Sequence, residues 1–194
     1  MKVRILFLIC FLSITCLLNA ADKPVIQIHT DNSSLIFRVA DNGRLYQSYL
    51  GKKLNHEADI SHLPQGTEAY ITHGMEDYFE PAIHILHNDG NPSLLLKYVS
   101  HETKAVSQGV NETIITLGDD KYPVTVKLHY VTYPAEDIIK TYTEISHKEK
   151  KPVVLHQYAS SMLHLNRAKY YLTEFSGDWA HEANISDQPL EFGK

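Results

Sequence analysis

The chain has 194 residues, of which 43% are hydrophobic and 21% are charged, and its formal net charge is −5 at pH 7. A chain of this length can bury a substantial core as one domain, and its acidic balance argues against nucleic acid as a partner. The two cysteines, Cys10 and Cys16, lie close to the start of the chain, which leaves the remainder with no disulfide.

The start of the chain has the pattern of a secretory signal peptide. Lys2 and Arg4 form a basic start, residues 5–18 are mostly apolar, and small residues close the segment at Ala20. The apolar run is shorter than the roughly 20 residues that a membrane-spanning helix needs, and polar residues follow it at once. A leader peptide is therefore the expected role of this segment.

Removal of residues 1–20 during export would place residues 21–194 in the periplasm or the medium. The remaining chain would have a net charge of −7, because two basic residues leave with the leader. We expect no membrane attachment after cleavage. The alternatives are an uncleaved anchor and a lipoprotein site at Cys16, although the three residues before Cys16 lack the small Gly or Ala that such sites usually carry.

Beyond the leader, the chain consists mainly of short runs in which apolar and polar residues alternate. This period of two, with many β-branched and aromatic side chains, is typical of half-buried strands. The candidate strands, in chain order, are residues 25–29, 35–40, 44–50, 82–87, 94–100, 112–117, 122–131, 138–146, 153–163 and 170–175. No amphipathic helix of three turns is expected. The predicted fold class is all-β, an antiparallel β-sandwich.

Two pairs of neighbouring runs have the turn chemistry of hairpins. The second and third runs are separated by Asp41-Asn42-Gly43, where Asn and Gly tolerate the positive φ that a tight turn demands. The fourth and fifth runs flank residues 88–92, which include Gly90 and Pro92. We predict a hairpin at each of these turns.

The run over residues 122–131 has the clearest alternation. Its even-numbered residues are apolar or aromatic, and its odd-numbered residues from 125 to 129 are polar. Because successive side chains of a strand point to opposite faces, we predict that Val126 and Leu128 lie in the core. Lys127 and His129 are predicted to face water.

Twelve histidines raise the question of a metal site. The pattern H-E-x-x-H is missing, and no cysteine lies outside the leader to complete a thiolate set. His84 and His87 stand three positions apart on a predicted strand, so they are expected on opposite faces. The sequence predicts no metal site and no cofactor.

Hydrolysis of a glycoside needs two carboxyl groups about 5–9 Å apart. The candidates by residue type alone are Glu76, Asp77, Glu80, Asp119, Asp120 and Glu182. The adjacent pair Asp119-Asp120 is typical of a solvated turn, and Ser160-Ser161 has no Gly-x-Ser-x-Gly pattern around it. The aromatic residues, Trp179 above all, could stack on sugars, although most strand tyrosines bury their rings. No catalytic residue is predicted.

Four stretches resemble the N-terminal domain of family 36 α-galactosidases. Residues 175–182 and 189–193 resemble its Gly-x-Trp-x-x-Glu and Pro-Leu-x-x-Gly segments. Residues 74–82 resemble its Gly-x-x-Asp-Phe-Arg-x-Pro-Ala loop, with Phe79 in place of the arginine, and residues 44–52 resemble its opening hairpin. The residues that match these motifs, and for which an interface or structural role is expected, are Gly74, Asp77, Pro81, Gly177, Trp179 and Glu182.

The resemblance implies a β-supersandwich that precedes a (β/α)8 barrel, in an enzyme that hydrolyses terminal α-galactosides with retention. Both catalytic aspartates of that family belong to the barrel, and no position here matches either. Residues 21–194 would then be a non-catalytic domain, incomplete at its C-terminal end. Its partners would be the barrel of the same parent chain, neighbouring subunits of a homo-oligomer and, through the parent, an α-galactoside.

In some family members a loop that corresponds to residues 55–72 reaches the sugar bound by a neighbouring subunit. That loop is short here, and the role is not carried over to Asp59, His62 or Glu68. The alternative to the enzyme domain is a free-standing secreted sandwich that binds sugars or serves in adhesion.

Overall fold

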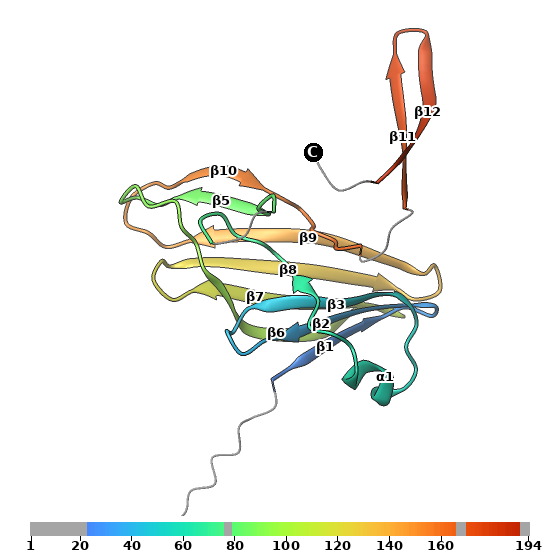
Figure 1. The fold of residues 1–194 in the computed structure, drawn as a ribbon, viewed down its shortest axis with the longest axis horizontal. Coiled ribbons are helices and arrows are strands. Elements are labelled where there is room, and N and C mark those ends of the chain that lie inside the picture. The colour runs from blue at the N-terminus through green and yellow to red at the C-terminus, as the bar shows by residue number, and fades with distance from the viewer. Residues whose placement is uncertain (1–22, 76–78, 166–169, 191–194) are drawn as a thin grey trace, which may run out of the picture.

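The computed structural model describes residues 23–75, 79–165 and 170–190, which form an antiparallel β-sandwich (Figure 1). The strands are β1 Val25–His29, β2 Ser33–Val39, β3 Leu45–Lys52, β4 Thr67–Glu68, β5 Ile83–Leu86, β6 Leu96–Ser107, β7 Val110–Asp119, β8 Val124–Tyr133, β9 Ile138–His147, β10 Val154–Tyr158, β11 Tyr171–Asp178 and β12 His181–Pro189. One short helix, α1, spans Glu57–Ser61. Within the described residues, no helix has the length and apolar character needed to cross a membrane. The predicted all-β fold is confirmed.

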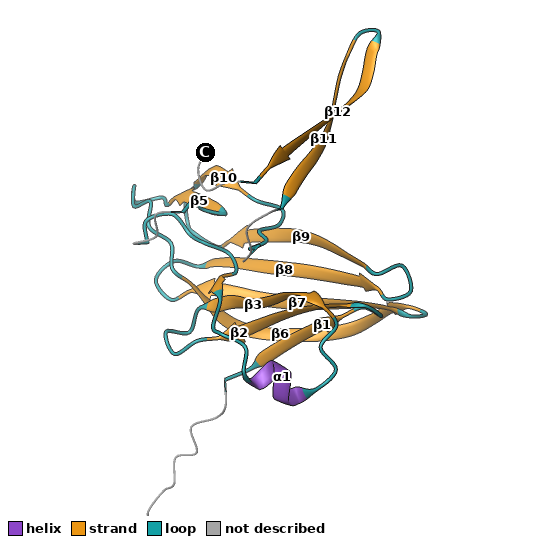
Figure 2. Ribbon diagram, turned by 45° about the vertical axis from the view of Figure 1, so that its right-hand side comes forward, coloured by secondary structure: helices purple, strands orange, loops and turns teal. Residues whose placement is uncertain are grey.

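Two four-stranded sheets form the body of the molecule (Figure 2). One sheet has the strand order β1-β2-β3-β4 and the other has the order β6-β7-β8-β9. Ile28 and Phe37 from the first sheet join Ile115 and Val126 from the second in one hydrophobic cluster. The remaining strands form two ribbons, β10-β5 beside the body and β11-β12, which stands clear of it.

The first predicted hairpin is confirmed. β2 and β3 pair in antiparallel register, with Val39 opposite Leu45. The side-chain oxygen of Asn42 accepts a hydrogen bond of 2.9 Å from the backbone N–H of Arg44, which closes the turn. Local turn chemistry was sufficient here because both strands belong to the same sheet.

The second predicted hairpin is wrong, although both of its strands exist. The turn forms, with the backbone N–H of His87 donating to the carbonyl oxygen of Asn91 at 2.9 Å. After it, however, β5 pairs with β10 and β6 pairs with β7. The turn therefore carries the chain from one sheet to another. Turn residues determine that the chain reverses, but the pairing partner depends on which strand completes each buried face.

Strand β8 has the predicted core face, with Val126 and Leu128 buried against the first sheet. On the other face Lys127 is half-buried, and the expectation that His129 faces water is wrong. His129 is buried because its ring stacks on Tyr142 of the neighbouring strand, with ring centroids 4.2 Å apart. Side chains on the outer face of a sheet can thus shield one another without any second layer.

The bounds of two strands in the C-terminal part of the chain also differ from expectation. The run at residues 153–163 forms a strand only over β10, after which the chain leaves the ribbon at Ala159. The run at residues 170–175 corresponds to β11, which extends to Asp178, so Trp179 lies in the turn between β11 and β12. β12 was not predicted, because its polar sequence HEANISDQP shows no alternation and both of its faces are exposed.

Candidate functional site

The residues that match the family motifs lie in two separate places. The first is the loop before β5. A Cβ atom at Gly74 would stand 2.8 Å from the Cα of Ser93, so this close approach of two backbones requires glycine. The carbonyl oxygen of Pro81 accepts a hydrogen bond of 2.9 Å from the side chain of Gln157, which ties β10 to this loop. Asp77 lies outside the described residues.

The second place is the β11–β12 ribbon, which we call the arm and which projects away from the body (Figure 1). Gly177 lies in β11 and Glu182 in β12, and Trp179 occupies the turn between them with 92% of its surface exposed. Two alanines near the tip, Ala180 and Ala183, have φ angles of 62° and 57°. These angles are unusual for residues with a Cβ, so the backbone beside the exposed Trp179 is strained.

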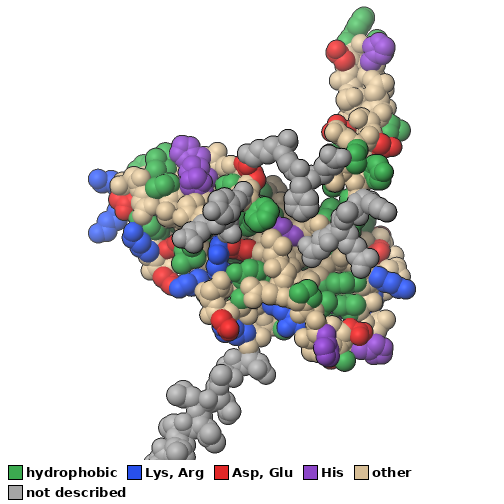
Figure 3. Space-filling view, viewed as in Figure 1, with side chains coloured by type: hydrophobic (Ala, Val, Ile, Leu, Met, Phe, Trp, Pro, Cys, Tyr) green, Lys and Arg blue, Asp and Glu red, His purple; other side chains and the backbone are tan. Residues whose placement is uncertain are grey.

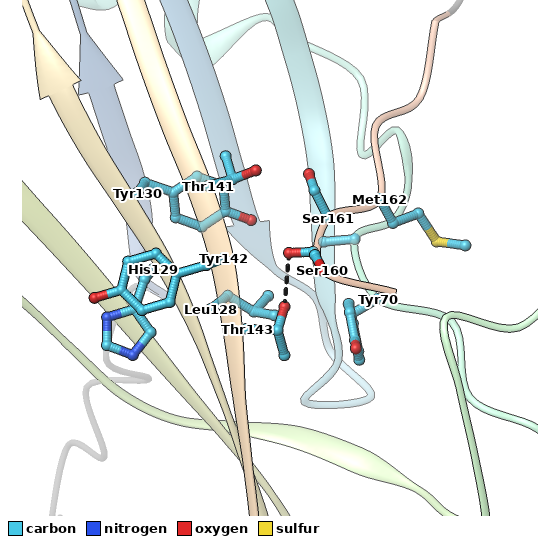
Figure 4. Close-up of a pocket in the computed structure, with 11 residues that line it drawn as sticks. Tyr70, Leu128, His129, Tyr130, Thr141, Tyr142, Thr143, Ser160, Ser161 and Met162 are labelled. Atoms are coloured by element: carbon cyan, nitrogen blue, oxygen red, sulfur yellow. Dashed lines mark hydrogen bonds between the residues drawn. The ribbon is translucent and has the colours of Figure 1, made fainter. Parts of the chain in front are cut away.

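A shallow hollow opens between β8, β9 and the segment that follows β10 (Figure 4). It encloses about 200 Å³, including the space open to solvent. The hydroxyl of Tyr70 donates to the carbonyl oxygen of Ala159 at 2.8 Å, and the hydroxyl of Thr143 donates to that of Ser160 at 3.0 Å. These bonds hold the segment after β10 across the hollow.

The hollow is lined mainly by polar and aromatic side chains. Its described lining residues are Ala69, Tyr70, Leu128, His129, Tyr130, Thr141, Tyr142, Thr143, Ser160, Ser161 and Met162, and none of them is acidic. Burial raises the pKa of Tyr70 above its ordinary value, so its hydroxyl stays protonated. The hollow can donate and accept hydrogen bonds, but its lining has no carboxyl group for general acid catalysis.

The described carboxylates among the catalytic candidates either order a turn, pair with a lysine or lie exposed at the surface. Asp119 accepts hydrogen bonds from the backbone N–H groups of Leu95, at 2.6 Å, and of Tyr122, at 2.8 Å, so it orders the turn before β8. Asp120 forms an exposed ion pair with Lys97. Glu80 and Glu182 are exposed. Glu76 and Asp77 fall outside the described residues.

The carboxylate with the most perturbed environment is Glu112, which the sequence did not single out. It lies on the outer face of the second sheet, where it accepts hydrogen bonds from Tyr142 at 2.6 Å and His129 at 2.9 Å. Lys104 lies 3.0 Å away. These partners, the Tyr142 hydroxyl first, lower the pKa of Glu112 from 4.5 to about 2. Glu112 is thus held as an anion, which is unsuited to proton donation.

Glu112→Gln is expected to lower the free energy of unfolding at pH 7 by about 1 kcal/mol. The effect is modest because glutamine can keep part of the hydrogen bonding, and because the network, although its members Glu112 and His129 are only 6% exposed, lies in a single layer of side chains close to water. Since the folded-state pKa is depressed, this stabilisation is complete above about pH 4.5 and is lost as the pH falls toward 2. Urea unfolding of both proteins at pH 7, 4 and 3 measures the difference.

Glu102→Gln, an exposed carboxylate on β6 of the same sheet, is the matched control for that experiment. It should leave the pH dependence of stability unchanged. The unsubstituted chain and the Glu112 variant could instead lose the same free energy of unfolding between pH 4.5 and pH 2. Glu112 would then not be the source of the pH dependence.

His84 of β5 is partly exposed and His87, just past the end of β5, is buried, in agreement with their predicted placement on opposite faces. His84 faces outward and stacks on His73 with ring centroids 3.7 Å apart, and His156 lies beyond it. Burial, with the neighbouring His73 and His156, lowers the pKa of His84. His87 is buried and its ring contacts the carboxylate of Glu149 at 2.7 Å. No group of three or more potential ligands in the described part of the chain could hold a metal ion.

Sequence reasoning missed the Glu112 network and the hollow for the same reason. Both are built from strands that are distant in sequence or from a strand and a loop, as in the pairing of Tyr70 with Ala159. One signal was available, since Glu112, His129 and Tyr142 all occupy outward positions of adjacent strands. That signal can be read only after the strand register is known.

Comparison with protein families gives one match that covers most of the chain. A family model described as "Glycosyl hydrolase family 36 N-terminal domain" matches residues 42–194. The expected resemblance is therefore confirmed.

Two fungal proteins show the relationship at the level of sequence. "Probable alpha-galactosidase G" of Aspergillus terreus and "Alpha-galactosidase C" of Emericella nidulans are each 25% identical to this chain over 133 residues. The match covers 62% of this chain and 18% of each relative. The chain thus corresponds to less than a fifth of the length of these relatives.

Solved structures share the fold. The α-galactosidase from Lactobacillus brevis has a TM-score of 0.74 and 21% sequence identity, over 87% of this chain and 28% of that chain. The GH36 α-galactosidase AgaA from Geobacillus stearothermophilus has a TM-score of 0.78 and 19% identity, over 88% and 28% of the two chains. These likenesses extend over nearly all of the described residues and so establish the sandwich architecture.

Proposed function

We propose that this chain is the non-catalytic front domain of a larger α-galactosidase. The chain belongs to the family of glycosyl hydrolase family 36 N-terminal domains. The observation that carries the proposal is the family match over residues 42–194, which coincides with a fold shared by solved α-galactosidases. The parent enzyme would act on terminal α-galactosides. The catalytic domain of the same parent chain would be the principal partner.

The carboxylates of the described residues support a non-catalytic role. A retaining glycosidase needs one carboxylate nucleophile and one carboxylic acid about 5–5.5 Å apart. Asp119 is engaged by backbone N–H groups, and Glu112 is held as an anion by three partners. The lining of the hollow is free of acids among its described residues. Catalysis is therefore assigned to another domain of the parent.

Hydrolysis of an aryl α-galactoside by the purified chain tests this assignment. We expect no turnover above that of a mock preparation purified in the same way from cells without the chain. A family 36 α-galactosidase with its barrel serves as the positive control. Turnover above the mock preparation would overturn the assignment of catalysis to a separate domain.

Titration of the same preparation with galactose distinguishes the second class of function. Hydroxyl groups from Tyr70 and Thr143 at the hollow, and the exposed ring of Trp179, are the features that a free-standing sugar-binding sandwich would use. The enzyme-domain proposal expects no saturable heat of binding. Saturable binding by a soluble, cooperatively unfolding chain would favour the free-standing binding module.

We also propose that the protein is exported and that its leader is removed near Ala20. The basic start, the apolar run and the small residues at the end of the segment support this proposal. N-terminal sequencing of the protein recovered outside the cytoplasm should then begin at or near Ala21. Exported protein that still begins at Met1 would contradict it.

A further inference from the structure

The ring of Tyr142 lies flat on the outer face of the second sheet. Tyr142 belongs to β9, and its hydroxyl donates to the carboxylate of Glu112 on β7 at 2.6 Å, so the side chain crosses the whole of β8. Neighbouring strands lie about 4.8 Å apart, and side chains normally stand upright from a sheet. The ring of His129 on β8 stacks on it, with ring centroids 4.2 Å apart and ring planes inclined by 12° (Figure 4).

One face of the Tyr142 ring is open to solvent. Tyr142 is 39% exposed, whereas Glu112 and His129 are each 6% exposed and lie beneath it. Because His129 covers the inner face of the ring, the exposed area belongs to the outer face. The hydrogen bond to Glu112 fixes the ring in this orientation. A rigid aromatic face binds a flat apolar surface with little further loss of conformational entropy.

A buried nitrogen beneath the ring lacks a hydrogen-bond partner among the described residues. The Nδ1 atom of His129 lies 2.9 Å from Glu112 and must donate to it, because an ionised carboxylate only accepts. In the neutral ring the Nε2 atom then keeps a lone pair, and it is buried without a partner. Such a group costs free energy until a donor reaches it. The acceptor therefore points to a ligand that carries a hydroxyl or another donor.

Glu144 stands at the entrance to this nitrogen. Its Oε2 atom lies 3.7 Å from Nε2 of His129, which is beyond hydrogen-bond distance. The side chain is 53% exposed and pairs with Lys127 at 3.3 Å. Because a surface pair of this kind is weak, the carboxylate can turn toward a ligand. The two acceptors, imidazole and carboxylate, are spaced to receive two neighbouring hydroxyl groups of one molecule.

The charges around Tyr142 balance, which favours an uncharged ligand. The row of side chains that contains Tyr142 and the rows on either side of it carry equal numbers of bases and acids, which are Lys104, Lys127, Lys140, Glu102, Glu112 and Glu144. Lysine and arginine side chains gather instead at the end of the β10-β5 ribbon (Figure 3). An anionic ligand would find its complement there, and a neutral polar ligand suits the face around Tyr142.

We propose that this face binds a neutral polysaccharide, with one pyranose ring stacked on Tyr142 and two of its hydroxyls donating to His129 Nε2 and Glu144. We call these residues, with Lys140, the outer-face site. A pyranose has the two features that the site requires, because C–H groups line a face of its ring and hydroxyls surround the rim. The Nζ atom of Lys140 lies 6.0 Å from the centroid of the Tyr142 ring, where it can donate to a further hydroxyl.

The outer-face site does not rest on the proposed enzymatic parent. It contacts one face of one sugar ring, so free galactose is held too weakly to give a saturable heat of binding. A polysaccharide presents many such rings, and the high local concentration of units raises its apparent affinity. The site would therefore hold the protein on a carbohydrate polymer without taking part in hydrolysis.

Native gels cast with and without galactomannan, a soluble polymer of pyranoses, test the outer-face site. The polymer should retard the purified chain relative to a reference protein that does not bind it. Tyr142→Ala should raise the apparent dissociation constant by at least about 10-fold, because the stacking surface is lost. Tyr142→Phe keeps the ring and loses the bond to Glu112, so it should weaken binding less. Tyr158→Ala, at an exposed tyrosine of β10, should leave the retardation unchanged.

Nitrogen NMR of the histidine side chains in the unsubstituted chain gives a readout that a folding defect cannot imitate. The Nε2 signal of His129, identified by its loss in His129→Gln, should move toward the position of a hydrogen-bonded nitrogen when galactomannan oligosaccharides are added. A signal that stays in place would overturn the site, as would a chain that the polymer does not retard or that Tyr142→Ala leaves equally retarded. None of these results bears on the assay of hydrolysis, in which turnover would overturn the enzyme-domain proposal alone.

Discussion

Gly66→Ala is expected to lower the free energy of unfolding by about 3–5 kcal/mol. Gly66 has a φ of +83°, which costs a residue with a side chain about 1–2 kcal/mol. A Cβ atom there would also lie 1.9 Å from the carbonyl oxygen of Gln47 and 2.9 Å from the Cα of Ser48. Both clashing atoms belong to the backbone of β3. The clash can be removed only if the strand or the loop moves, which costs about as much as overpacking a core.

The same substitution would disturb the loop over residues 55–72. The side-chain amide of Gln47 in β3 donates a hydrogen bond of 2.9 Å to the backbone carbonyl oxygen of His164. A movement of β3 would therefore also displace the segment after β10. We therefore expect the Gly66 variant to lose protection from hydrogen exchange in both segments. A Gly66 variant whose loop keeps its native protection from hydrogen exchange would contradict this expectation.

Gly90→Ala is the matched control for Gly66→Ala. Gly90 has a nearly identical φ of +85°, but no atom lies within 4 Å of the position that its Cβ would occupy. It should therefore cost only the conformational penalty of about 1–2 kcal/mol. Denaturant unfolding of the two variants compares them directly, and equal losses would mean that the approach to Gln47 is not the cause.

Leu128→Ala is expected to destabilise the fold by about 2–5 kcal/mol. The side chain of Leu128 is buried in the cluster between the two sheets, where it lies near Ile115 of the paired strand. Its removal loses apolar burial and leaves a cavity that a close-packed core fills only in part. Chemical denaturation with an unchanged slope would identify the loss as one of stability alone.

Lys127→Ala tests the face assignment of the same strand. Lys127 points away from the core and forms an ion pair of 3.3 Å with Glu144, in which both side chains are substantially exposed. Such pairs contribute little, so the expected change is within about 0.5 kcal/mol. A loss as large as that of Leu128→Ala would show that the outer face of β8 carries as much of the stability as the core face.

Strand content could be read from the sequence because the signal is local. The alternation in residues 122–131 corresponds to β8, and its core residues Val126 and Leu128 are buried as predicted. The β2–β3 hairpin was predictable for a similar reason, since a three-residue turn joins two strands of one sheet. β12 lacked this signal because both of its faces are exposed, so no apolar periodicity was required of it.

The candidate site was less predictable than the fold. The motif residues Gly74 and Pro81 lie in the loop before β5, whereas Gly177, Trp179 and Glu182 lie on the arm, and their resemblance to family motifs did not indicate this separation. The sequence motifs marked the positions for which a role was expected. They could not indicate that the arm would stand clear of the body with its large apolar side chains exposed.

The sequence by itself determined most of the strands, though not β12, which face of the clearest strand is apolar, and to which family the chain belongs, because periodicity and motif order are properties of neighbouring residues. The tertiary structure alone decided that β5 pairs with β10, about 70 residues away, and not with the strand after its own turn. It also decided that His129 is buried against Tyr142 and Glu112. Such contacts join residues that are distant along the chain, and their energies exist only once the sheets have assembled.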